Sequence, residues 1–377
     1  MIHPSFPRYS RWLLALTALV SAHGAWAAAC TKANETCTEW IAMEGPLSAL
    51  VYRSHALGAR NETITRALVI VHGGSRDAHT NFNHTLAAAF LADALEDTVI
   101  VSPRFASNEE SLSKQSANTV AAARAAPRDK LASNELNWIS EFGGRHWNAG
   151  GFAINAKVTS YEVVDEILRK LARKDVFPNL RTIVVAGHSS GGQFVSRYQM
   201  VNRVHDQLGV KVAYLVSNPG AYTYLDNQRP TASAIPPNVS SSVSGFIPMG
   251  LAKPPPPFVP YPDARHCTTY DTWPYGLKDR VAYAARSSEE QLKQQAATRP
   301  TTFLLGELDI LPLVNFDISC NAMAQGASRL SRGLAFARYV RENFGAQHKV
   351  VVLNGCGHHT RCMLTSDQTL PLLFPKE

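Results

Sequence analysis

The 377-residue sequence lacks the features that mark several large classes of protein. Past residue 27 no segment approaches a run of apolar residues long enough to span a membrane, so we expect no membrane span in the chain that follows a leader. Basic residues form no run with interleaved aromatics, which argues against a nucleic-acid surface. The chain also has no C-x-x-C pair and no internal repeat, so neither a cysteine-based zinc site nor a repeat architecture is expected.

The first 27 residues are different, because they have the layout of a secretory signal peptide. Two arginines precede an apolar run over residues 12–22, and small residues follow. This pattern predicts export to a secreted or periplasmic location, with cleavage after Ala27 or Ala29. Residues 28–377 are then the mature chain, which we expect to form one catalytic domain.

An exported chain folds where an even set of cysteines forms disulfides. The six cysteines are Cys30, Cys37, Cys267, Cys320, Cys356 and Cys362. We favour the local pairs Cys30–Cys37 and Cys356–Cys362, which leaves Cys267 for Cys320. Two alternatives stay open: one or more cysteines remain free and buried, or Cys30 is the lipidated residue of a lipoprotein.

Apolar segments alternate with amphipathic ones along most of the chain. Strands are expected over 47–55, 66–71, 98–101, 182–186, 211–216, 301–305 and 349–353, and helices over 81–95, 160–173, 190–203 and 328–344. Apolar strands that alternate with helices predict an α/β fold with a mostly parallel central sheet and helices on both faces.

Two long stretches interrupt this alternation. Residues 107–155 are polar and contain Trp138 and Trp147, and residues 219–300 are rich in proline and aromatic residues. Loops of this length in a compact domain usually carry function or cover a site. We therefore predict that 219–300 is an inserted lid or cap above the carboxyl ends of the strands; the alternative is a surface excursion without a functional role.

The segment Gly187-His-Ser-Ser-Gly191 matches the pattern G-x-S-x-G between an expected strand and an expected helix. A serine at such a sharp turn adopts a strained backbone, and the glycines let strand and helix close around it. The turn lifts the Ser189 hydroxyl clear of the sheet. It also directs the amide of Ser190 toward the place where negative charge develops during attack on a carbonyl.

A second glycine motif, His72-Gly-Gly-Ser75, ends an earlier strand. A second oxyanion donor belongs in this position in the strand–turn–helix architecture described above. We predict that the amides of Gly74 and Ser190 form the oxyanion hole, with Ser75 as an alternative to Gly74. His72 is expected to brace the loop.

A serine nucleophile needs a histidine base, and the base needs a carboxylate that orients it. Asp309 follows the expected strand 301–305, and His358 follows the strand 349–353, each in a short polar turn. The order Ser189, Asp309, His358 is the one this architecture uses. The alternatives are Glu307 or Asp317 for the acid and His359 for the base.

Together these motifs resemble the α/β-hydrolase superfamily, and the resemblance covers nearly all of the mature chain. The motifs that carry it are Gly187–Gly192, His72–Gly74, Gly306–Pro312 and Gly355–His358. The leader and the sequence around Ser189 are similar to those of secreted bacterial esterases near the polyhydroxyalkanoate depolymerase and feruloyl esterase groups. The resemblance implies an α/β-hydrolase fold and a serine esterase acting on a small or polymeric ester.

The expected reaction is hydrolysis of a carboxylic ester through an acyl-enzyme, with no metal and no organic cofactor. One alternative is a serine peptidase or amidase of the same fold, which would use the same groups on a different bond. Another is a noncatalytic binding protein built on the hydrolase scaffold.

Overall fold

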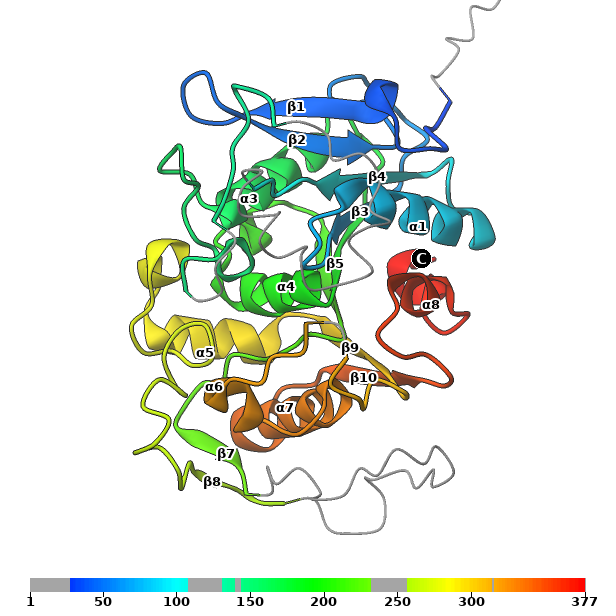
Figure 1. Ribbon diagram of the computed structural model, residues 1–377. Helices are drawn as coiled ribbons and strands as arrows, with labels where there is room; N and C mark the ends of the chain where they lie inside the picture. Colours follow the sequence, from blue (N-terminus) through cyan, green and yellow to red (C-terminus); the bar gives the residue numbers. More distant parts are fainter. Residues whose placement is uncertain (1–27, 108–130, 140–143, 232–255, 314, 377) are drawn as a thin grey trace, which may run out of the picture.

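A computed structural model describes residues 28–107, 131–139, 144–231, 256–313 and 315–376 (Figure 1). The expected signal peptide, residues 1–27, lies outside the described residues. Among the helices of the described ranges, none is both long enough and apolar enough to cross a membrane.

The centre of the fold is an eight-stranded sheet with the order β1-β2-β4-β3-β5-β6-β9-β10. Its strands are β1 (Thr38–Ala42), β2 (Ser48–Arg53), β3 (Arg66–Val71), β4 (Thr98–Pro103), β5 (Thr182–His188), β6 (Lys211–Ser217), β9 (Thr301–Gly306) and β10 (Lys349–Leu353). The pairs β1–β2 and β2–β4 are antiparallel, and the other pairs are parallel. The mostly parallel sheet predicted from the sequence is confirmed.

Side chains of the central strands are buried on both faces of the sheet. In β3 the side chains of Val69 and Val71 join one apolar core, whereas those of Leu68 and Ile70 join a second. Successive side chains of a strand point to opposite faces. A strand with a core on each side therefore needs apolar residues at every position, which explains its unbroken apolar sequence.

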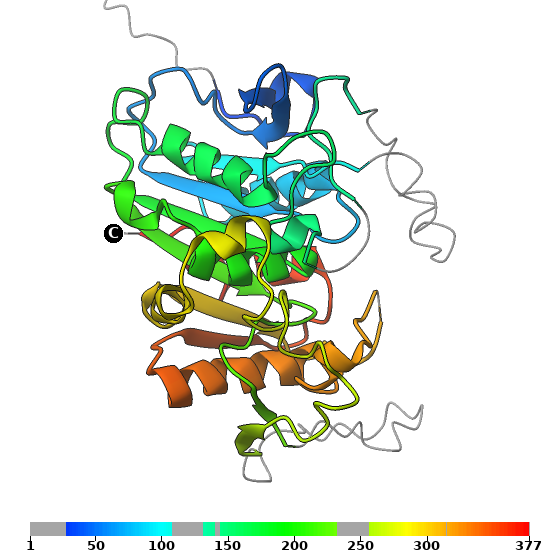
Figure 2. The same ribbon diagram turned by 90° about the vertical axis from the view of Figure 1, so that its left-hand side faces the viewer.

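Helices cover both faces. The larger core lies under α3 (Ser160–Leu171), α4 (Ser190–Val201), α5 (Glu289–Thr298) and α7 (Arg329–Phe344), which lie in front of the sheet in Figure 2. The other core lies under α1 (Ala78–Leu91), α8 (Thr360–Thr365) and α9 (Leu370–Leu373). The short helix α6 (Cys320–Met323) belongs to the segment between β9 and α7.

Local signals explain where the helices begin. The hydroxyl of Thr159 accepts a hydrogen bond from the amide of Glu162, and the carboxylate of Glu162 accepts one from the amide of Thr159. This capping box satisfies helix donors that would otherwise lack partners and stabilises α3 by about 1 kcal/mol. A different helix, α7, ends at Gly345. This residue has φ 70°, a backbone conformation that glycine adopts without steric cost.

Some elements have no counterpart in the sequence-based expectations. Among the strands and α-helices of the described residues they are β1, the helices α5, α6, α8 and α9, and the small antiparallel pair β7 (Gln228–Pro230) and β8 (Phe258–Pro260). The pair β7–β8 and α5 both belong to the segment 219–300. Within the described part of that segment, α5 packs against α4 and α7, and the aromatic side chains of Tyr222, Tyr224 and Trp273 are buried in the core.

The structure contains three disulfides, Cys30–Cys37, Cys267–Cys320 and Cys356–Cys362. These are the pairings favoured from the sequence. The first bridges the chain just before β1, the second joins the segment 219–300 to the segment after β9, and the third closes a short loop after β10.

Candidate active site

Ser189 stands at the turn between β5 and α4. Its backbone has φ 60° and ψ −121°, a combination that a residue with a side chain rarely adopts. The amide of Ser189 donates to the carbonyl of Ser217 in the neighbouring strand at 3.0 Å. Surrounding contacts thus hold the strained backbone in place, as expected for a nucleophile elbow.

The glycines on either side of Ser189 make this turn possible. A Cβ atom at Gly187 would lie 2.3 Å from the carbonyl oxygen of Gly191, and one at Gly191 would lie 2.1 Å from the carbonyl oxygen of Val71. Both distances are far below van der Waals contact with backbone atoms that cannot move aside. The two positions therefore accept only glycine while β5, α4 and β3 remain packed as they are.

The structure brings Ser189, His358 and Asp309 into one chain of hydrogen bonds. Nε2 of His358 lies 2.9 Å from Oγ of Ser189, and Nδ1 of His358 lies 2.7 Å from Oδ2 of Asp309. Because an ionised carboxylate only accepts, Nδ1 carries the proton and Nε2 is free to accept from the serine hydroxyl. This is the arrangement in which a histidine can remove a proton from a serine.

The other acids and the second histidine have different partners. Oε2 of Glu307 accepts from the amide of Gly355 at 3.0 Å, and Oδ2 of Asp317 accepts from the hydroxyl of Tyr275 at 2.7 Å. His359 is exposed, and its Nδ1 accepts from the amide of Cys362 at 3.4 Å, which caps α8. Of these candidates, Asp309 is the carboxylate and His358 the imidazole that the structure places in line with Ser189.

The loop after β3 lies against the elbow. A Cβ atom at Gly73 would lie 3.7 Å from Cβ of Ser189, and one at Gly74 would lie 3.1 Å from Oγ of Ser190. Ser190 is the first residue of α4, so its amide is among the N–H groups that a helix leaves without an intrahelical partner. The two predicted oxyanion donors, Gly74 and Ser190, therefore lie side by side at the positive end of a helix.

His72 and Arg76 fix the position of this loop. The amide of Phe105 donates to Nε2 of His72 at 3.1 Å, so Nδ1 donates to the carbonyl of Gly73 at 2.9 Å. Burial lowers the pKa of His72 to about 3, which keeps the ring neutral. The buried guanidinium of Arg76 donates to the carbonyls of Phe105, Ala106 and Trp138. Both residues brace the loop.

Three residues at the site were not assigned a role from the sequence. His188 is buried with its ring centroid 4.8 Å from that of His358, and Nδ1 of His188 lies 3.1 Å from Oγ of Ser217. Burial, and then the charge of His358, lower the pKa of His188 well below its ordinary value. Asn218 and Arg329 contact the loops that carry the base and the acid. The sequence held one signal for each of two of these residues: His188 directly precedes Ser189, and Asn218 directly follows a strand. Either position would have suggested a place at the site.

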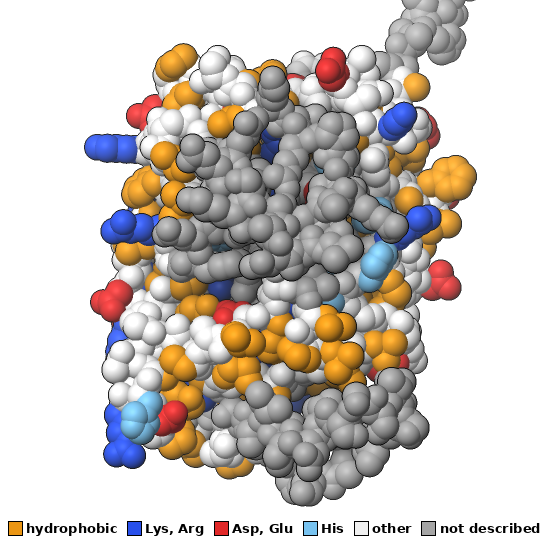
Figure 3. Space-filling view, viewed as in Figure 1, with side chains coloured by type: hydrophobic (Ala, Val, Ile, Leu, Met, Phe, Trp, Pro, Cys, Tyr) orange, Lys and Arg blue, Asp and Glu red, His pale blue; other side chains and the backbone are white. Residues whose placement is uncertain are grey.

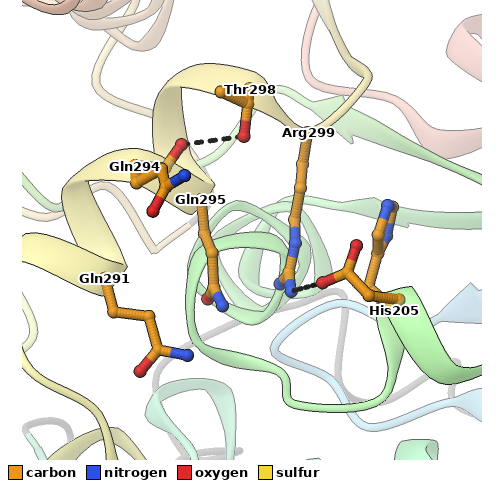
Figure 4. Close-up of a pocket in the computed structure, with 7 residues that line it drawn as sticks. His205, Gln291, Gln294, Gln295, Thr298 and Arg299 are labelled. Carbon is orange, nitrogen blue, oxygen red and sulfur yellow. Dashed lines mark hydrogen bonds and ion pairs between the residues drawn. The ribbon is translucent and has the colours of Figure 1, made fainter.

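Two hollows of the surface lie away from this site. Figure 4 shows one of them, with Arg299 beside the residues of α5. Its volume is about 480 Å³, and Arg299 pairs with Asp206 at 3.4 Å. It is lined by His205, Asp206, Gln291, Gln294, Gln295, Thr298 and Arg299. Arg299 precedes the amino end of β9, whereas Asp309 follows its carboxyl end, so this pocket lies at the opposite edge of the sheet. The other, between α1 and α8, includes Leu86 and Phe90.

No group of three or more histidine, cysteine, aspartate or glutamate side chains in the described ranges is arranged to hold a metal ion. The chemistry that this part of the chain offers is instead the hydrogen-bonded serine, histidine and aspartate.

Comparison with solved structures shows that the fold is shared with known proteins. The fold is similar to that of a poly(3-hydroxybutyrate) depolymerase from Bordetella parapertussis, with a TM-score of 0.53 and 18% identity over 88% of this chain and 85% of that one. It is also similar to that of poly(aspartic acid) hydrolase-1 from Sphingomonas sp. KT-1, with a TM-score of 0.54 and 18% identity over 89% and 97% of the two chains. At these identities the likeness concerns the fold.

Comparison with curated protein sequences gives no significant match. The model of the alpha/beta hydrolase family matches residues 68–370, which include the elbow, the acid loop and the base loop. This chain therefore belongs to the alpha/beta hydrolase family.

Proposed function

We propose that the protein is an exported serine hydrolase that cleaves carboxylic esters. The observation that carries the proposal is the position of His358, with Nε2 2.9 Å from Oγ of Ser189 and Nδ1 2.7 Å from Oδ2 of Asp309. Three disulfides support folding in an oxidising compartment outside the cytoplasm.

In the proposed reaction Oγ of Ser189 attacks the ester carbonyl while Nε2 of His358 takes the hydroxyl proton. The amides of Gly74 and Ser190 donate to the oxyanion of the tetrahedral intermediate. His358 then gives its proton to the departing alcohol, which leaves an acyl group on Ser189. A water molecule, deprotonated by His358, attacks this acyl-enzyme, and collapse of the second intermediate returns the proton to Ser189.

Exposed apolar side chains beside the acid support a substrate with an apolar portion. Leu308, Ile310, Leu311 and Leu313 are exposed in the segment that carries Asp309. Figure 3 shows apolar side chains gathered on the face of the molecule over β9, β10 and α7. A contiguous apolar surface is unusual on a soluble protein and favours contact with an apolar ligand. A series of p-nitrophenyl esters of rising acyl length tests this part of the proposal.

We propose that the part of the segment 219–300 that contains Cys267 and Tyr275 forms a lid next to the site, whereas α5 of the same segment packs into the fold. The disulfide Cys267–Cys320 joins this segment to the chain that follows Asp309. The hydroxyl of Tyr275 donates to Asp317 in the same region at 2.7 Å. Both links hold Cys267 and Tyr275 beside the loop of Asp309. A lid in this position would contact a substrate bound at Ser189.

The deciding experiment compares Ser189→Ala and His358→Ala with His359→Ala. Loss of either of the first two side chains should lower hydrolysis of p-nitrophenyl butyrate by about four orders of magnitude, with little change in Tm. His359→Ala is the matched control and should keep most of the activity. Wild-type activity in Ser189→Ala would end the proposal.

A second candidate is cleavage of an amide bond, because a poly(aspartic acid) hydrolase shares the fold and the same three groups act on amides. Turnover of a peptide p-nitroanilide above that of p-nitrophenyl butyrate would favour this candidate. A protein that neither turns over these substrates nor reacts with a fluorophosphonate probe would be a noncatalytic binding protein.

A further inference from the structure

Asp309 has a second charged partner besides His358. Nη1 of Arg329 donates to Oδ1 of Asp309 at 3.3 Å and to the carbonyl of Leu313 at 3.0 Å. The side chains of Arg329 and Asp309 are each only 2% exposed. Burying a guanidinium costs free energy unless opposite charge and hydrogen bonds compensate. An apolar side chain would fill this position without that cost, so packing alone does not explain an arginine here.

The first turn of α7 holds the backbone of Asp309 as well as its side chain. Arg329 is the first residue of α7, behind the capping residue Ser328. The amide of Leu330 donates to the backbone carbonyl of Asp309 at 3.2 Å. The acid is therefore attached at two points to a helix of 16 residues. With Oδ1 held by Arg329, Oδ2 is the oxygen that faces His358.

Arg329 and His358 contact the two oxygens of one carboxylate, that of Asp309. Asp309 is hydrogen-bonded to His358, and the ring of His188 from β5 lies against it. The other titratable and charged groups of this region act on His188 or on His84 of α1: they are Arg329 from α7, His359, and Arg361 from α8. Arg329 contributes to the lowered pKa of His188, whose ring lies against His358. A fixed positive charge on the carboxylate that His358 also contacts opposes a second positive charge on His358.

We propose that Arg329 is a positioning residue for the hydrolytic site, which orients the Asp309 carboxylate toward His358 and opposes protonation of His358 in weakly acidic solution. The inference rests on the proposed function. A positioning role of Arg329 differs from a purely structural role in its effect on pH dependence. A structural arginine would affect stability and kcat but would leave the pH dependence of the reaction unchanged.

The test is the pH profile of kcat/KM with p-nitrophenyl butyrate for Arg329→Met and Arg329→Gln. Both variants remove the charge, and the glutamine keeps a donor for Asp309. We expect the acidic limb of the profile to move to higher pH by about one unit, because the protonated base is no longer opposed by Arg329. We also expect kcat to fall about tenfold as the acid loses its fixed orientation.

Two further variants separate charge from packing. Arg329→Lys keeps the charge with poorer hydrogen-bond geometry, so kcat should fall while the acidic limb stays in place. Arg332→Met is the matched control, since Arg332 is fully buried one turn later and donates to the carbonyls of Gly220, Gly326 and Asp317. It should lower stability and leave the limb in place.

An unchanged limb in a folded neutral variant would overturn the proposal. So would failure of both neutral variants to fold while Arg332→Met folds, because Arg329 would then serve the stability of the fold. Failure of the proposed function would give a different result. In that case Ser189→Ala would keep the activity of the wild-type protein, whatever the Arg329 variants do.

Discussion

The side-chain amide of Asn218 donates to the backbone carbonyl of Gly357, the residue before His358, at 3.2 Å. Its Oδ1 accepts from the amide of Gly306 at 2.7 Å, just before the acid loop. Asn218 is fully buried directly after β6, the strand between β5 and β9, and has φ 42°. One side chain therefore connects the loop of the acid to the loop of the base.

We expect Asn218→Gly to lower kcat about tenfold with KM changed less than twofold, because both loops lose a shared anchor while the binding surface stays in place. Glycine accepts the positive φ, so the backbone is not strained. Asn218→Asp is the companion variant. It keeps the acceptor for Gly306 but places an oxygen against the carbonyl of Gly357, so its kcat should fall further. Wild-type kcat in both variants would show that the link is not needed.

The strained backbone of Ser189 makes a separate prediction about stability. Ser189→Gly and Ser189→Ala both remove the hydroxyl and should be equally inactive. At φ 60° and ψ −121° a Cβ atom costs about 1–3 kcal/mol, which exceeds the roughly 0.5–1 kcal/mol that glycine costs in chain entropy. The glycine variant should therefore melt about 2 °C above the alanine variant in a thermal scan. A lower Tm for Ser189→Gly would mean that the turn stores no strain.

The sequence was sufficient to predict the parts of the site that depend on local backbone. Gly187 is required by the backbone of Gly191 within the same strand–turn–helix unit, so this part of the pattern around Ser189 is local, whereas Gly191 is required by the backbone of Val71 in the neighbouring strand β3. Asp309 and His358 each follow a strand of the same parallel sheet. Because the carboxyl ends of parallel strands meet at one edge, their order in the chain predicts that they converge.

The supporting residues could not be predicted in this way. Arg329 meets an acid 20 residues away, and Asn218 meets backbone atoms 88 and 139 residues away. Such contacts depend on how α7 and β6 pack, and a single arginine or asparagine has no periodic signal. The choice between Glu307 and Asp309 was open for a related reason: both follow β9, and strand alternation does not continue into the turn.

The disulfide Cys356–Cys362 encloses His358, which predicts an effect on catalysis beyond stability. Replacing both cysteines by serine should lower kcat about tenfold, because the loop of the base becomes free to move away from Ser189. The loss of a bridge that spans 6 residues should cost about 2 kcal/mol of unfolding free energy. Activity and urea denaturation of the double variant measure the two effects.

Cys30–Cys37 provides the matched control for that experiment. It spans 7 residues, nearly the same loop length, but lies beside β1 at the opposite end of the strand order from β10. Its double serine variant should lose a similar free energy of unfolding and keep wild-type kcat. Equal losses of kcat in the two double variants would attribute the effect to global stability.

Four buried histidines among the described residues predict that the fold loses stability in weak acid. Burial is the main cause that lowers the pKa of His55 to about 4, that of His72 and His146 to about 3, and that of His188 well below its ordinary value. In the unfolded chain these groups titrate near pH 6.5. Below that pH the unfolded state therefore binds more protons than the folded state, which favours unfolding. The stabilisation is present above pH 6.5 and is lost as the pH falls toward the folded values. Each histidine should remove about 1.5 kcal/mol between pH 6.5 and 5.

Urea denaturation at pH 6.5 and at pH 5 measures this loss in the wild-type protein and in His55→Gln. The glutamine keeps a polar group for the hydroxyl of Ser54, which lies 3.0 Å from Nδ1 of His55, and removes one titrating ring. The loss in the variant should therefore be smaller by about 1.5 kcal/mol. Burial raises the pKa of Asp165 and so acts in the opposite direction, but it does so equally in both proteins and cancels from the difference. An identical pH dependence in the two proteins would mean that His55 is protonated in the folded state.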